Sequence, residues 1–140
     1  MRVDWGFEQP EMTMMKSSIG SIEWRDLTVS DAESIKRFYQ DVVGWRADPV
    51  SMGEYNDFNM TTADSDEPVA GICHARGDNA DQPAQWMMYV RVADISASVA
   101  TVKQLGGSLL RGPSEYAGDQ YYVIKDPAGA VITLYGATQS

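Results

Sequence analysis

Residues 22–45, IEWRDLTVSDAESIKRFYQDVVGW, contain the pattern from which the fold is predicted. Within it, Val29-Ser30-Asp31 recurs later in the chain as Val92-Ala93-Asp94, a shift of 63 positions. Asp31 lies thirteen positions before Gly44, and Asp94 lies thirteen positions before Gly107. Landmarks that return at one shift indicate two copies of the same supersecondary unit.

Each copy predicts a strand followed by a helix. The strands are expected at residues 22–29 and 86–92, which are rich in β-branched and aromatic side chains. Asp31 and Asp94 are suited to cap the helices, because a short carboxylate accepts from the free N–H groups of a first turn. Glycines such as Gly44 then predict the helix ends, since glycine tolerates the left-handed conformation there.

Three short strands are expected after each helix, so each copy is a βαβββ module. They lie near residues 45–47, 55–61 and 69–75 in the first module, and near 108–111, 120–125 and 130–135 in the second. A four-stranded sheet with one helix buries only one of its faces. We therefore expect an α+β fold in which two βαβββ modules form one curved mixed sheet with a concave cleft.

The length of 140 residues fits one domain. We expect an N-terminal extension at residues 1–18 and a single domain at residues 19–140. The first module covers about 21–75, a polar linker covers 76–84, and the second module covers about 85–136. The extension lacks the layout of a signal peptide, and no apolar run is long enough to cross a bilayer, so a cytoplasmic protein is expected.

Charge and composition exclude several classes of partner. The formal net charge is −9 and the isoelectric point is about 4.4, which argues against nucleic acid and anionic membranes. This charge permits a cationic ligand, although solubility alone accounts for it. Cys73 is the one cysteine and His74 the one histidine, so an intramolecular disulfide and a multi-cysteine zinc site are excluded.

Several motifs resemble the vicinal oxygen chelate (glyoxalase/bleomycin-resistance/dioxygenase) superfamily, and within it the glyoxalase-like proteins related to lactoylglutathione lyase. They are Val29-x-Asp31, Phe38-Tyr39-x-x-Val42-x-Gly44-Trp45, Val92-x-Asp94, Gly106-Gly107 and Asp126-Pro127-x-Gly129 followed by Ile132-Thr133-Leu134. The match runs from about residue 21 to 135. The resemblance implies paired βαβββ modules, commonly a homodimer, and a cleft that holds a divalent metal in many members.

In metal-dependent members the ligands are His, Glu or Gln, one from the opening strand and one from the last strand of each module. By this resemblance, the four positions are occupied here by Trp24, Gly71, Met87 and Thr133. Indole and glycine offer no ligand atom, a thioether suits hard cations poorly, and a lone hydroxyl is weak. We therefore expect no metal at the standard site and no cofactor.

A displaced metal site is the alternative, with Asp26 and His74 as ligands. Asp26 lies two residues from Trp24 and so shares its strand face. The simpler interpretation is that His74 faces solvent at a strand end and that Asp26 pairs with Arg91. Cys73 and His74 are adjacent in a strand, so they are expected on opposite faces.

Strand alternation predicts the lining of the cleft. Arg91 could hold a carboxylate or phosphate of a ligand, or form an internal salt bridge with Asp26. The aromatic side chains could equally be ordinary core. The expected lining comprises Trp24, Asp26, Thr28, Met87, Tyr89, Arg91, Thr133 and Tyr135, with Phe58 and Tyr121 or Tyr122 closing it.

Three functions remain open from the sequence. The first is a protein that binds a small organic molecule in a metal-free cleft, similar to the antibiotic-binding members of the superfamily. The second is an enzyme, either a metal-dependent lyase, isomerase or dioxygenase with displaced ligands or a metal-free catalyst with Asp26 or a tyrosine as acid or base. The third is a structural or regulatory module with a filled cleft.

Overall fold

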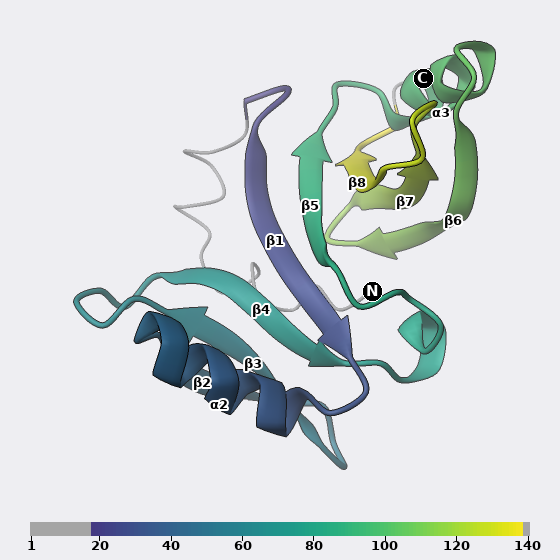
Figure 1. The fold of residues 1–140 in the computed structure, drawn as a ribbon. Helices are drawn as coiled ribbons and strands as arrows, with labels where there is room; N and C mark the ends of the chain where they lie inside the picture. The colour runs from purple at the N-terminus through teal and green to yellow at the C-terminus, as the bar shows by residue number, and fades with distance from the viewer. Residues whose placement is uncertain (1–17, 139–140) are drawn as a thin grey trace. The chain divides into compact units, whose positions relative to one another are not determined.

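The computed structural model describes residues 18–138, so all but the last residue of the expected N-terminal extension lies outside the described part. The element order is βαβββ twice, as predicted (Figure 1). The elements are β1 (Ile22–Val29), α2 (Ala32–Val43), β2 (Arg46–Ser51), β3 (Asn56–Thr61), β4 (Pro68–His74), the short 3-10 helix η1 (Gly77–Asn79), β5 (Trp86–Arg91), α3 (Ile95–Gln104), β6 (Ser108–Tyr116), β7 (Asp119–Lys125) and β8 (Val131–Gly136).

The helix ends follow the sequence signals. The side chain of Asp31 accepts from the backbone N–H of Ser34, and that of Asp94 accepts from those of Ser96 and Ala97. Gly44 ends α2 with a φ of +87° and donates its N–H to the carbonyl of Gln40. These contacts satisfy backbone groups that a helix end leaves without partners.

The described residues form two compact units, which together contain both modules. The first unit comprises residues 25–86, and the second comprises residues 87–138 together with residues 18–24. The segment before β1 joins the second unit because Gly20 donates its N–H to the carbonyl of Arg91, and Arg91 donates its own to the carbonyl of Ser21. The first module was expected to begin at about residue 21, whereas the compact units divide β1 after Trp24.

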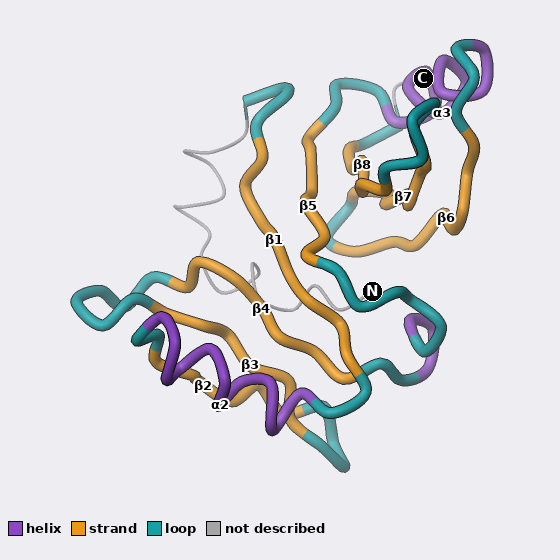
Figure 2. Tube along the Cα trace, viewed as in Figure 1, coloured by secondary structure: helices purple, strands orange, loops and turns teal. Residues whose placement is uncertain are grey.

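The first unit is a mixed sheet with α2 against one face. Its strand order is β2-β3-β4-β1, in which β1 runs parallel to β4 and the other pairs are antiparallel. Figure 2 shows α2 as the long helix of this unit. The core beneath α2 contains Ala32, Phe58, Met60, Ala70 and Ile72. Burial of side chains as large as Met60 and Ile72 stabilises the fold by roughly 1.5–3 kcal/mol each.

The second unit repeats this arrangement. Its strand order is β5-β8-β7-β6, with β5 parallel to β8 and the other pairs antiparallel. The predicted turn before β8 is present, since the Asp126 carboxylate accepts from the N–H groups of Ala128 and Ala130. Within the described residues, neither helix is long and apolar enough to span a membrane.

Candidate functional site

The sheet face of the second unit that lies away from α3 carries most of the predicted site. Ile124 lines a groove with α3 residues, and Tyr122 shares its face because side chains alternate along a strand. Tyr121 therefore lies on the opposite face, where it pairs with Tyr135 across β7 and β8. We call this opposite face the tyrosine face. Its residues include Tyr89, Arg91, Tyr121, Thr133 and Tyr135, and by strand alternation Met87.

Aromatic rings form the centre of the tyrosine face. The rings of Tyr121 and Tyr135 are stacked, with centroids 5.1 Å apart and an angle of 7° between the ring planes. Tyr89 meets Tyr121 edge-on at 6.3 Å. The guanidinium of Arg91 lies 5.3 Å from the ring centroid of Tyr135, within range of a cation–π interaction. Arg91, Tyr135 and Tyr121 thus form a row across three adjacent strands.

Arg91 forms an internal salt bridge. Its Nη1 lies 3.3 Å from Oδ2 of Asp119 at the start of β7, a partner that the sequence analysis did not consider. The phenol of Tyr135 donates to the carboxylate of Glu23 at 3.5 Å. Two carboxylates therefore accompany one guanidinium, which leaves this cluster with a net negative charge and makes it a poor anchor for an anion.

Burial controls the protonation of these groups. It raises the pKa of Tyr135 to about 12, and the negative charge of Glu23 adds to the shift. Burial, with the charge of Asp119, also raises the pKa of Tyr121. For Arg91, partial burial opposes the charge, but Asp119 outweighs it and the pKa is raised. At neutral pH the phenols thus remain hydrogen-bond donors and Arg91 remains charged.

Thr133 is fully buried on the tyrosine face, next to Tyr89 in register. Within residues 18–138, its hydroxyl oxygen has no hydrogen-bond partner. A buried polar group without a partner costs about 1–3 kcal/mol. The hydroxyl is therefore a polar group that a bound molecule could satisfy.

Two predicted cleft residues lie on the helix-covered faces instead. Phe58 packs in the core with Ala32, and the ammonium of Lys36 on α2 lies 4.6 Å from its ring centroid. Tyr122 pairs with Leu134 and shares the α3 side with Ile124. Both assignments to the cleft are wrong, because a strand turns alternate side chains to opposite faces and aromatic character does not report which face.

Asp26 and Thr28 belong to the first unit. Both are buried, and they alternate with Leu27, whose register partner Ile72 belongs to the core under α2. They therefore lie on the sheet face away from α2, as predicted. Asp26 pairs in register with Gly71, and Thr28 with Cys73.

His74 is held by a carboxylate that the sequence analysis missed. Its backbone N–H donates to Oδ1 of Asp57 at 2.9 Å, and its Nδ1 lies 3.6 Å from the same oxygen. The imidazole is 15% exposed, so the interpretation of a solvent-facing histidine is wrong. Asp57 sits near the start of β3, far from His74 in sequence, which is why no local pattern revealed the pair.

The positions at which the family resemblance predicts metal ligands can be compared between the modules. Asp26 faces Gly71 in register, and Tyr89, which lies 63 positions later, faces Thr133. Gly71 and Thr133 therefore occupy equivalent places. The four residues expected at these positions, Trp24, Gly71, Met87 and Thr133, offer one hydroxyl and one thioether between them, so their side chains do not fit a divalent metal. No group of three His, Cys, Asp or Glu side chains suited to a metal occurs among the described residues.

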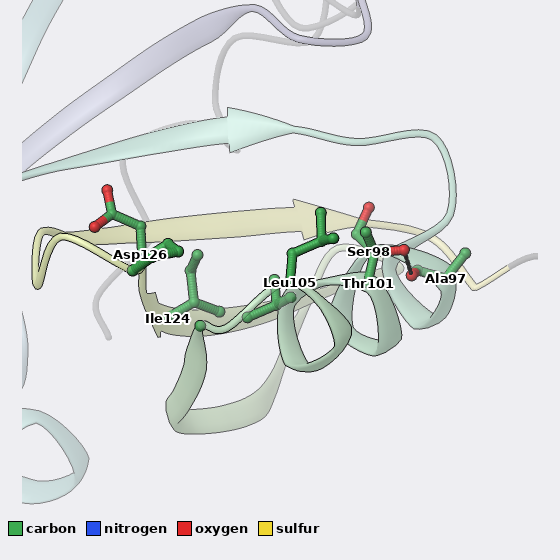
Figure 3. Close-up of a pocket in the computed structure, with 9 residues that line it drawn as sticks. Ala97, Ser98, Thr101, Leu105, Ile124 and Asp126 are labelled. Carbon is green, nitrogen blue, oxygen red and sulfur yellow. Dashed lines mark hydrogen bonds between the residues drawn. The ribbon is translucent and has the colours of Figure 1, made fainter.

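An open groove of about 390 Å³ lies on the other face of the second unit, beside α3. Figure 3 shows it running along the helix from Ala97 and Ser98 to Ile124 and Asp126. We call it the α3 groove. Its apolar lining includes Val102, Leu105, Ile124 and Pro127, and its polar lining includes Ser98 and Asp126. No local sequence pattern predicts this groove, because its lining comes from two separated segments, residues 97–107 and 124–127.

Comparison with known proteins agrees with the fold. Methylmalonyl-CoA epimerase from Streptomyces coelicolor, solved as a variant with 2-nitronate-propionyl-CoA, has a TM-score of 0.52 at 16% identity, covering 87% of this chain and 100% of that one. A homoprotocatechuate 2,3-dioxygenase variant from B. fuscum has a TM-score of 0.54 at 18% identity, covering 89% of this chain and 34% of that one. At these identities the likeness shows the fold alone.

Curated relatives are more similar in sequence. "Putative glyoxylase CFP32" of Mycobacterium tuberculosis is 31% identical over 124 residues, covering 86% of this chain and 47% of the relative. "Anthracycline biosynthesis protein DnrV" of Streptomyces peucetius is 27% identical over 134 residues, covering 87% of this chain and 49% of the relative. The chain thus spans about half the length of these relatives. The sequence model of one family matches residues 18–134, and the chain belongs to that family, the Glyoxalase/Bleomycin resistance protein/Dioxygenase superfamily.

Proposed function

We propose that this chain binds a small organic molecule on the tyrosine face without the help of a metal. The observation that carries the proposal is the buried hydroxyl of Thr133, which lies beside the Arg91–Tyr135–Tyr121 row and has no partner within the described residues. An apolar, aromatic wall with a few fixed polar groups is the usual composition of a small-molecule site. The donor set at the family's ligand positions removes the usual reason for a metal there.

The ligand is a neutral or cationic aromatic compound. Arg91 is already neutralised by Asp119, and the carboxylate of Glu23 adds further negative charge. A carboxylate or phosphate would meet repulsion at this face, whereas a planar ring matches the tyrosine rings in shape. The name of one relative refers to anthracycline biosynthesis, which fits a ligand of fused aromatic rings. The net charge of −9 also favours a cation over an anion.

The regulatory alternative is favoured by one observation. Thr133 and Tyr89 are almost completely buried, as they would be in a module whose face is permanently filled. A ligand must then displace whatever covers these side chains.

For an enzyme without a metal, buried Asp26 remains the candidate acid or base. We also propose a homodimer, which light scattering during gel filtration would measure.

The first test is the metal content of the purified protein, with calorimetric titration of zinc, nickel and manganese. Absence of stoichiometric metal and of binding heat is expected. One tightly bound metal per chain would overturn the proposal and favour the enzyme alternative.

The second test is a thermal-shift screen with matched aromatic compounds that carry an ammonium, a hydroxyl or a carboxylate. Stabilisation by the ammonium and hydroxyl compounds is expected, and it should be lost in Tyr121→Leu. The matched control is Tyr122→Leu, which changes the neighbouring residue on the other face and should keep it. A panel that stabilises neither protein would support the filled, regulatory module instead.

A further inference from the structure

The α3 groove combines apolar lining with an uncovered leucine. Leu105 is 71% exposed, although it is one of the large apolar side chains of the second unit. Val102, Ile124 and Pro127 line the same groove. A volume of about 390 Å³ lies at the lower end of the range for small-molecule pockets, about 300–1,000 Å³. The groove is therefore large enough for one aromatic ring with a short side chain.

Negative charge gathers at one end of the groove. The chain just after α3 lies beside the Asp126-Pro127 turn, since a Cβ at Gly106 would lie 3.8 Å from Cγ of Pro127, and Leu105 lines the same groove as Asp126. The C-terminal end of a helix carries the negative end of its dipole. Asp126 adds a carboxylate at the same end. Both features favour a cation there and disfavour an anion.

The carboxylate of Asp126 is fixed but not neutralised. Its Oδ1 accepts from the backbone N–H groups of Ala128 and Ala130. Among residues 18–138, no lysine or arginine forms an ion pair with it. Lys125 neighbours it in sequence but alternates with Ile124, which places Lys125 on the other sheet face, and Lys103 does not line the groove.

We propose that the α3 groove is a second binding site, which takes a small amphipathic cation. The ammonium lies at the Asp126 end, near the C-terminus of α3, and the apolar part lies over Leu105 and Ile124. This site is on the opposite side of the sheet from the tyrosine face. The proposal of this second site does not depend on the function proposed for the tyrosine face.

The test uses three probes of one shape: 2-phenylethylammonium, 2-phenylethanol and 3-phenylpropanoate. Titrations of the ¹⁵N-labelled full chain are followed by NMR, which reports where each probe binds. We expect shifts in α3 and in the turn around Asp126, with the ammonium binding at least about fivefold more tightly than the alcohol and the carboxylate most weakly. Equal affinity for ammonium and alcohol would overturn the proposal. So would shifts confined to the tyrosine face, because they would assign the cation to that site.

Two variants separate charge from apolar contact. Asp126→Asn keeps an oxygen that can accept from the N–H groups of Ala128 and Ala130, so the turn is retained while the charge is lost. It should reduce the preference for the ammonium to the small part that the C-terminus of α3 contributes, and leave the affinity for the alcohol unchanged. Leu105→Ser should weaken all three probes, whereas Leu110→Ser, which changes another exposed leucine outside the groove, should change none. A preference for the ammonium that is undiminished in Asp126→Asn would contradict the assignment.

Discussion

Tyr121 and Tyr135 face each other across antiparallel β7 and β8 with their rings 5.1 Å apart and nearly parallel. The pair is held on one side by Arg91, which lies over Tyr135 and binds Asp119. This arrangement connects the stability of the second unit with the chemistry of its proposed ligand site.

Replacing Tyr121 with leucine should destabilise the protein by about 2 kcal/mol, because it removes a buried ring and the stacking contact of that ring with Tyr135. Urea denaturation followed by circular dichroism measures this change. Tyr122→Leu is the matched control and should cost about 1 kcal/mol or less, since that side chain is less buried. Equal losses in the two variants would show that the stack adds nothing specific.

The protein should lose stability in alkali because of Tyr135. Its pKa is about 12 in the folded chain, against an ordinary value of about 10. Between these values the unfolded chain has lost the proton and the folded chain still holds it, so the free energy of unfolding falls as pH rises. The full contribution is present below pH 10, and the loss by pH 12 is on the order of 2 kcal/mol. Denaturant unfolding at several pH values between 10 and 12 measures this loss. In Tyr135→Phe the free energy of unfolding should fall less steeply with pH than in the unchanged protein.

The salt bridge between Arg91 and Asp119 should contribute modestly. Both side chains are partly exposed, so solvent screens the pair, and a coupling energy of about 1 kcal/mol is expected. A double-mutant cycle with Arg91→Gln and Asp119→Asn measures it, at low and high salt. The coupling should shrink at high salt, and additive effects of the two changes would show that the pair contributes nothing.

Thr133→Val should be neutral or stabilise the chain by up to about 1 kcal/mol, because it replaces a buried hydroxyl that has no partner with a methyl group of similar size. The same change should weaken any ligand that the tyrosine face binds, since its hydrogen bond to the hydroxyl is lost. Chemical denaturation of the variant measures the change in stability, and ligand titration of the same variant measures the change in affinity. A loss of more than 1 kcal/mol without ligand would mean that the hydroxyl is satisfied in the free protein.

The two βαβββ modules could be predicted from local sequence patterns. Val29-Ser30-Asp31 and its repeat, the capping aspartates and the glycine that ends α2 act through local backbone chemistry, which does not need the rest of the fold. The turn at Asp126 was likewise predicted from the local motif Asp126-Pro127-x-Gly129. Strand alternation also grouped Tyr89 with Arg91 and Thr133 with Tyr135.

Contacts between side chains from different strands could not be predicted in this way, because they depend on how the strands pair. Asp119 reaches Arg91, and Asp57 reaches His74, from strands that are distant in sequence. Phe58 fell on the helix-covered face because the pairing of β3 with β4 sets which of two alternating positions points to the core. The α3 groove depends on the close approach of α3 to the turn before β8, and no periodicity in the sequence encodes that distance.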